Sequence, residues 1–98
     1  MSAFEVVLLP AAEAEAREAF LWYFERSPLA ADAFRSELLD AIDGLATRAA
    51  MWPEDDDGFR HYILRHFPYT VFYEIIDLTV TVFAVAHQRR QPRYWQHR

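Results

Sequence analysis

The residues best suited to catalysis or binding lie near the C-terminal end of the chain. There His87 is followed by three arginines and two aromatic residues in the stretch HQRRQPRYW. Guanidinium groups bind phosphates and carboxylates in a bidentate manner, and an imidazole or a phenol can move a proton. Arg, Tyr and Trp also dominate the hot spots of protein interfaces. The cluster is therefore suited either to breaking a phosphodiester bond or to gripping another macromolecule.

Each of these residues also has a simpler interpretation. His87 ends an apolar run, and a semi-buried imidazole there more often bonds to the backbone than acts as a general base. The arginines either bind carboxylates of a partner or keep a tail in water, and both interpretations stay open. Upstream, we expect Arg60 and Arg65 to pair with acidic residues of the helices.

The sequence predicts no metal and no cofactor. It lacks Cys, and its four histidines do not have the paired spacing of a zinc site. The run Asp55 to Asp57 does not follow a calcium-loop pattern and is typical of a solvated turn. Without Cys, a long apolar run or a leader, the chain is expected to be cytoplasmic, with no disulfide and no membrane contact.

Acidic and basic residues are segregated along the chain. Residues 1–58 hold four arginines and thirteen acidic residues, whereas residues 59–98 hold six arginines and two acidic residues. The net charge of −5 is unfavourable for a protein whose affinity would come from contacts to phosphates. We therefore expect no direct binding of nucleic acid by the chain alone, although its basic half suits an acidic surface.

A strand and two helices are predicted in the first half of the chain. The apolar run 4–9 is typical of a strand, and the Ala- and Glu-rich stretch 11–26 has helical periodicity. Ser27 caps free N–H groups and the proline after it favours a first helical position, so a second helix runs from about residue 28 to 50. The helices should form a hairpin, packed by Phe20, Trp22 and Trp52.

The second half is rich in β-branched and aromatic residues. Three stretches, FRHYILRHF, YTVFYEII and LTVTVFAVAH, are separated by breaks too short for anything but antiparallel neighbours. Alternation along the last stretch predicts one face made of Val80, Val82, Ala84 and Ala86, and the other made of Thr81, Phe83, Val85 and His87. Since both faces are largely apolar, the one not covered by helices should seek a partner.

These elements predict an α+β fold in one domain spanning residues 1–98. The order is β-α-α-β-β-β, with a helical hairpin packed on a small antiparallel sheet. The N-terminal strand should pair at or near the edge of the meander. Ninety-eight residues suffice for one hydrophobic core and are too few for two.

This order, followed by a basic aromatic tail, resembles the RelE/ParE toxin superfamily over the whole chain. Two stretches carry the resemblance: YILRHFPY with the following VFY in residues 62–73, and VAHQRRQPRYW in residues 85–95. The resemblance implies a toxin of a type II toxin–antitoxin system. Such a toxin is held silent by a cognate antitoxin.

The superfamily implies two mechanisms, and the residues favour one. RelE-like members cut mRNA in the ribosome with cations converging on the sheet face and a C-terminal aromatic or imidazole. The corresponding positions here are Thr70, His61, Ile63 and Gln88, none of them a fixed cation, and only Tyr94 matches a catalytic tyrosine. ParE-like members instead inhibit DNA gyrase by binding, which needs no catalytic set.

We therefore expect a ParE-like toxin that binds gyrase and is neutralised by an antitoxin wrapping the sheet and hairpin. The expected contact residues are Arg65, His87, Arg89, Arg90, Arg93, Tyr94 and Trp95. One alternative is a ribosome-dependent endoribonuclease using Arg65, His87, Arg89 and Tyr94. The other is a degenerate toxin that acts only in operon co-repression. The favoured hypothesis requires the arginine-rich terminus to be presented outward and not folded in as filler.

Overall fold

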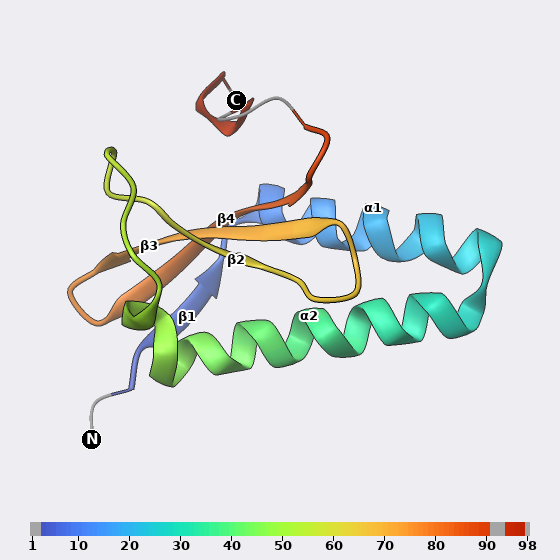
Figure 1. The fold of residues 1–98 in the computed structure, drawn as a ribbon, viewed down its shortest axis with the longest axis horizontal. Coiled ribbons are helices and arrows are strands. Elements are labelled where there is room, and N and C mark those ends of the chain that lie inside the picture. Colours follow the sequence, from blue (N-terminus) through green and yellow to red (C-terminus); the bar gives the residue numbers. More distant parts are fainter. Residues whose placement is uncertain (1–2, 91–93, 98) are drawn as a thin grey trace.

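A computed structural model describes residues 3–90 and 94–97 and has the predicted order of elements (Figure 1). The strands are β1 (Glu5–Leu8), β2 (Arg60–Ile63), β3 (Tyr69–Ile76) and β4 (Thr79–His87). The helices are α1 (Pro10–Arg26) and α2 (Pro28–Arg48), and two short 3-10 helices, η1 (Ala49–Met51) and η2 (Tyr94–His97), complete the fold. No helix in the described ranges is long and apolar enough to cross a membrane.

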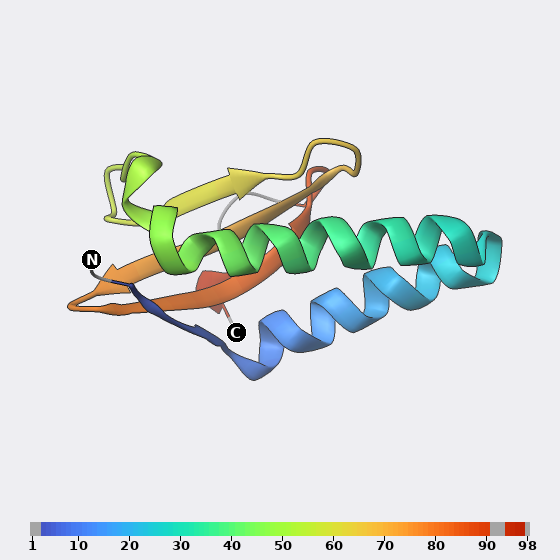
Figure 2. The same ribbon diagram turned by 90° about the horizontal axis from the view of Figure 1, so that it is seen from below.

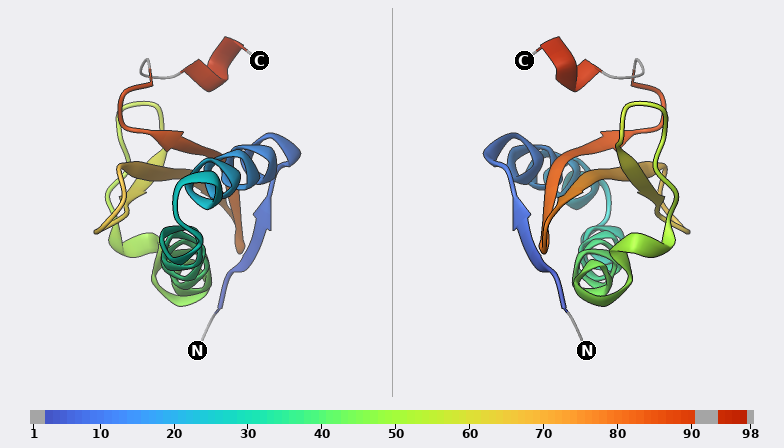
Figure 3. Two further views of the ribbon diagram at one scale, coloured as in Figure 1. Left: turned by 90° about the vertical axis from the view of Figure 1, so that its right-hand side faces the viewer. Right: turned by 90° about the vertical axis from the view of Figure 1, so that its left-hand side faces the viewer.

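The four strands form one sheet in the order β1-β4-β3-β2. The second, third and fourth strands are an antiparallel meander, and β1 lies at the edge beside β4, both as predicted. The sheet as a whole is mixed, because β1 runs parallel to β4. A parallel pair needs a long crossover, which the helical hairpin supplies. Figure 2 and Figure 3 show both helices on one side of the sheet, here called the inner face.

Local signals set the ends of the helices. Pro10 occupies the first turn of α1, where its missing N–H costs nothing. At the corner, the amide of Ser27 donates to the Tyr23 carbonyl at 2.7 Å, and the Ser27 hydroxyl accepts from the amide of Ala30 at 3.2 Å. One residue thus ends α1 and caps α2, as the sequence predicted.

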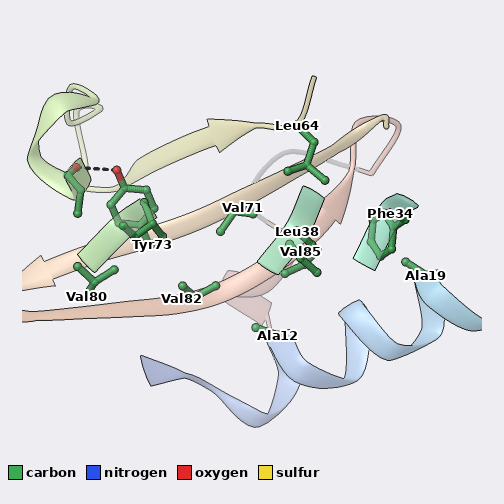
Figure 4. Close-up of a cluster of buried hydrophobic side chains, with 12 residues drawn as sticks. Ala12, Ala19, Phe34, Leu38, Leu64, Val71, Tyr73, Val80, Val82 and Val85 are labelled. Atoms are coloured by element: carbon green, nitrogen blue, oxygen red, sulfur yellow. Dashed lines mark hydrogen bonds between the residues drawn. The ribbon is translucent and has the colours of Figure 1, made fainter. Parts of the chain in front are cut away.

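The hydrophobic core lies between the inner face and the hairpin (Figure 4). Its largest fully buried side chains are Tyr73, Phe34, Leu45, Val71, Val80 and Val82. Small residues of α1, Ala12 and Ala19, are also buried and let the helix approach the sheet closely. The aromatic rings of Tyr23, Phe34, Phe67 and Tyr69 pack together where the hairpin meets the β2–β3 turn.

Tyr73 brings a polar hydroxyl into this core. Its hydroxyl donates to the Ala49 carbonyl at 2.6 Å, the bond drawn in Figure 4. Burial raises the pKa of Tyr73 to about 12, with a smaller opposing effect of Arg60. The bond ties β3 to the end of the helical hairpin.

Replacing Tyr73 with phenylalanine is expected to destabilise the protein by about 1–2 kcal/mol, because a buried carbonyl loses its donor. Urea unfolding followed by circular dichroism measures this loss. Tyr62→Phe is the matched control, since the Tyr62 hydroxyl bonds to no residue in the described part of the chain. Equal stability of Tyr73→Phe and the native protein would contradict the assigned role.

The predicted faces of β4 are wrong beyond Phe83. The register pairs Tyr73 with Val82 but Phe72 with Ala84, so Phe83 is an extra residue in a β-bulge. A bulge shifts the alternation by one residue. Val85 therefore faces the helices and joins the core, whereas Ala84 and Ala86 face the opposite side, here called the outer face.

Other predictions need smaller corrections. Trp22 was expected in the packing of the hairpin but is 50% exposed, with the Arg26 guanidinium stacked 3.7 Å from its ring centroid. Phe20 and Trp52 do pack against the core, as predicted. The strand expected at residues 59–67 spans only Arg60–Ile63, because the chain turns after Leu64.

Candidate functional site

The C-terminal segment folds back over the outer face of the sheet (Figure 1, Figure 3). The Trp95 ring lies on Phe72, with centroids 4.3 Å apart, and on Phe83 at 5.3 Å. Its indole N–H is buried and has no acceptor among the residues that the structure describes. The expectation of a terminus presented wholly outward is therefore wrong for Trp95, which covers the sheet.

Tyr94 is held by a residue that sequence reasoning did not select. Its hydroxyl donates to the carboxylate of Glu15 on α1, which also accepts the Val85 amide at 2.9 Å. That amide has no strand partner, because β1 ends at Leu8 opposite Val82. Glu15 thus joins α1, β4 and η2. The sequence did not predict this role of Glu15, because a glutamate in an Ala- and Glu-rich helix is typical of a solvated face.

The arginines after β4 differ in their surroundings. The Arg90 guanidinium stacks 4.0 Å from the centroid of the Tyr94 ring. The Arg89 side chain is exposed, and Arg93 lies outside the described residues. The Arg90 guanidinium is therefore presented beside η2, and Arg89, the residue before it, has an exposed side chain.

His87 has the simpler of its two predicted roles. Its Nδ1 accepts the backbone amide of Arg89 at 3.0 Å, and its ring packs edge-on against Tyr69 at 5.2 Å. A nitrogen that accepts from a backbone amide is not available to take a proton from a substrate. The prediction of a strand-end imidazole bonded to the backbone is confirmed.

The residues of the alternative ribonuclease set are not assembled in one place. Two members of that set, His87 and Tyr94, line a cavity of about 490 Å³ between α1 and the end of β4, whereas Arg89 does not line it. Arg65 lies instead in a separate groove against α2. The hydroxyl of Tyr94 is already committed to Glu15.

The two arginines near β2 do not pair as predicted. Arg60 binds Glu54 at 3.1 Å, an acid of the loop after η1 and not of a helix. For Arg65, the helix acid Glu37 accepts the backbone amide, and the guanidinium has no ion pair with any residue that the structure describes.

The outer face carries no fixed cation on β2 or β3. The register pairs His61 with Phe72 and Ile63 with Thr70, so all four side chains share that face. His61, Ile63 and Thr70 are the three positions on these strands at which the resemblance would place cations in RNA-cleaving members. The His61 ring instead packs 5.8 Å from that of Phe72. The face is aromatic, and Trp95 lies on part of it.

A second surface lies along the hairpin. A groove of about 290 Å³ between α1 and α2 has an apolar floor that includes Phe20, Leu38 and Leu39. Arg17 lines it from α1 and Arg35 from α2, and both side chains are exposed. An apolar floor between two cations suits an amphipathic segment with acidic flanks.

Glu37 fastens the β2–β3 turn to α2. Its carboxylate accepts the amide of His66 at 3.2 Å and the His66 ring Nδ1 at 2.8 Å, in addition to the Arg65 amide. Desolvation tends to raise the pKa of Glu37, but the hydrogen bonds from His66 and Arg65 outweigh it and lower the pKa.

A lowered pKa in the folded state means that Glu37 stabilises the fold above its ordinary pKa and loses this contribution as pH falls through the folded value. The native protein should therefore lose more stability than Glu37→Gln between about pH 6 and pH 3. Urea unfolding at several pH values in that range measures how steeply the free energy of unfolding of each protein changes with pH. Asp40→Asn, one turn along the same helix, should keep the native slope; an unchanged slope in Glu37→Gln would contradict the assignment.

The comparisons with known proteins agree with this geometry. The family model described as "ParE toxin of type II toxin-antitoxin system, parDE" matches residues 6–92. A solved structure titled "Chromosomal ParDE TA system from P. aeruginosa" has a TM-score of 0.77 at 13% identity, covering 87% of this chain and 96% of that one. At that identity the likeness shows the fold alone. A search of curated proteins finds no match. Since the family model spans most of the sequence, the chain belongs to the ParE toxin family of type II toxin–antitoxin systems.

Proposed function

We propose that this protein is a toxin that inhibits DNA gyrase by binding it, and that it does not cleave RNA. The observation that carries the proposal is the state of the residues that RNA cleavage would need. Tyr94 donates its hydroxyl to Glu15, and His87 accepts a backbone amide through Nδ1. The Tyr94 hydroxyl and the Nδ1 of His87 are therefore both engaged within the fold.

The lack of fixed cations on the outer face of β2 and β3 supports the same proposal. Cleavage of a phosphodiester develops negative charge that preorganised cations must stabilise. The positions facing outward on β2 and β3 hold His61, Ile63 and Thr70. Arg90 stacks on Tyr94 of η2 and follows the exposed Arg89 in the sequence, and two such arginines suit an acidic protein surface.

Membership of this family implies an antitoxin partner. We propose that an amphipathic helix of the antitoxin neutralises the toxin by docking in the groove between α1 and α2. Its apolar stripe would cover Phe20 and Leu39, and its acidic flanks would meet Arg17 and Arg35. The exposed apolar side chains of this hairpin give such a helix a surface to bury.

Purified protein tests the main proposal in two parallel assays. With gyrase and relaxed plasmid, it is expected to block supercoiling or to trap cleaved DNA on the enzyme. In a translating extract, it is expected to leave mRNA intact. Cleaved mRNA together with unaffected gyrase would overturn the proposal and favour the ribonuclease alternative.

A further inference from the structure

The cavity of about 490 Å³ between α1 and the end of β4 takes no part in the function proposed above, apart from its lining residue Arg90. Its walls are largely aromatic, because Trp22 and Tyr23 of α1 and Tyr69 of β3 line it. The Trp22 and Tyr23 rings meet edge to face with centroids 5.1 Å apart, and Tyr23 meets Tyr69 at 6.4 Å. Aromatic walls with a few polar groups are typical of a site for a small molecule.

Trp22 leaves apolar surface for a ligand to cover. It is 50% exposed, although tryptophan has one of the largest apolar side chains. The Arg26 guanidinium stacks on its ring 3.7 Å from the centroid, so the helix already uses this ring to hold a charged group. Because Trp22 also lines the cavity, a ligand bound there buries apolar area that the fold leaves in water.

Two opposite charges line this cavity without meeting each other. The Glu18 carboxylate, on an exposed part of α1, forms no hydrogen bond or ion pair with any residue that the structure describes. The Arg90 guanidinium stacks on Tyr94 and likewise has no ion pair within the described ranges. A carboxylate and a guanidinium within reach of each other form a strong bidentate pair. Since Glu18 and Arg90 do not pair, they lie at separate parts of the lining.

The other polar groups of the lining divide in the same way. Glu15 is engaged by β4 and η2, so Glu18 is the acid of the lining that is available to a cation. His87 accepts the Arg89 amide through Nδ1, so its neutral ring carries a proton on Nε2 and keeps one donor. His87 and Arg90 both follow from the end of β4, and both can donate to a carboxylate.

We infer that this cavity binds a free α-amino acid with a large apolar side chain, held as a zwitterion. The ammonium group of the ligand meets Glu18, and its carboxylate meets Arg90 and the Nε2–H of His87. The side chain of the ligand covers Trp22 and Tyr69. A ligand with both charges satisfies the two unpaired groups at once, whereas an ion of one sign leaves one of them unpaired. The inference does not depend on gyrase inhibition, so either can fail while the other stands.

Titration of the full-length protein with three related probes, followed by NMR, tests the zwitterion. Phenylalanine carries both charges, phenylpropionate lacks the ammonium group, and phenethylamine lacks the carboxylate. Phenylalanine is expected to bind with a Kd of about 1 mM or tighter, and each of the other probes at least about tenfold more weakly. Equal binding of the three probes, or no binding of phenylalanine at about 10 mM, would overturn the inference.

The indole signals locate the bound probe. In proton–nitrogen correlation spectra, phenylalanine should shift the indole N–H signal of Trp22, which lines the cavity. It should leave the signal of Trp52 in place, because Trp52 lines the separate groove against α2. A shift at Trp52 without one at Trp22 would contradict the assigned site.

Single substitutions assign each charge of the ligand to a residue. Glu18→Gln should weaken phenylalanine about tenfold and leave phenylpropionate unchanged, because only the ammonium group loses its partner. Arg90→Gln should weaken phenylalanine to a similar extent and leave phenethylamine unchanged. Glu25→Gln is the matched control, since Glu25 is an exposed acid about two turns further along α1 and does not line the cavity. An equal loss in Glu18→Gln and Glu25→Gln would show that net charge selects the ligand, and the inference would fail.

Discussion

Phe34→Ala is expected to destabilise the protein by about 3–5 kcal/mol, the range for removing a buried phenylalanine ring. Phe34 is 1% exposed, and its ring lies 5.3 Å from Tyr23, 5.4 Å from Phe67 and 5.3 Å from Tyr69. It joins both helices to the β2–β3 turn. A small domain has about 5–15 kcal/mol of stability, so this single change removes a large share of it.

Thermal unfolding followed by circular dichroism measures the effect. The midpoint should fall by roughly 15 °C or more, since each kcal/mol shifts a domain of this size by about 4–8 °C. Phe24→Ala is the control on the same hairpin: Phe24 is 51% exposed and stacks only on Phe20 in the described contacts. A similar fall in the two variants would show that Phe34 is not a centre of the core.

The elements with local chemical signals could be predicted from the sequence. Pro10 and Ser27 marked the helix ends, and the structure has a first turn and a shared cap at those residues. The β3 stretch was predicted to its last residue because its β-branched and aromatic residues are bounded by breaks on both sides. The sheet was predicted to be antiparallel, and the parallel pairing of β1 was missed because it depends on where the hairpin returns the chain.

The missed features depend on tertiary contacts. Nothing in TVTVFAVAH marks Phe83 as an inserted residue, so the alternation predicted beyond it failed. Trp95 appeared to be an exposed anchor because a tail sequence does not reveal the aromatic outer face on which its ring lies. Glu15 accepts the amide of Val85, which no strand pairs with because β1 is shorter than β4.

The proposed binding role of the tail is compatible with the packing of Trp95. Trp95 and Tyr94 fasten the segment to the outer face and to α1. Arg90 is positioned by its stacking on Tyr94, so less side-chain entropy is lost when it meets a partner. Arg90 is thus positioned beside anchored aromatic residues, and the exposed Arg89 precedes it.

Arg89→Ala with Arg90→Ala is expected to reduce gyrase inhibition by roughly tenfold or more, the effect of losing a hot spot worth about 1.4 kcal/mol or more. The fold should remain, because the Arg89 side chain is exposed and Arg90 contributes only its stacking on Tyr94. Dose–response curves for supercoiling measure the change. Unchanged Trp fluorescence and thermal midpoint would confirm that η2 still covers the sheet.

The matched control is Arg17→Ala with Arg35→Ala, which removes two exposed arginines from the hairpin groove. This variant should inhibit gyrase like the native protein but resist neutralisation by the antitoxin. The tail variant should inhibit gyrase more weakly and still be neutralised by the antitoxin. Opposite effects separate a target-binding surface from an antitoxin-binding surface, since loss of overall positive charge is the same in both. If the tail variant inhibits gyrase as strongly as the native protein, Arg89 and Arg90 are solvated surface and gyrase must bind elsewhere on the fold.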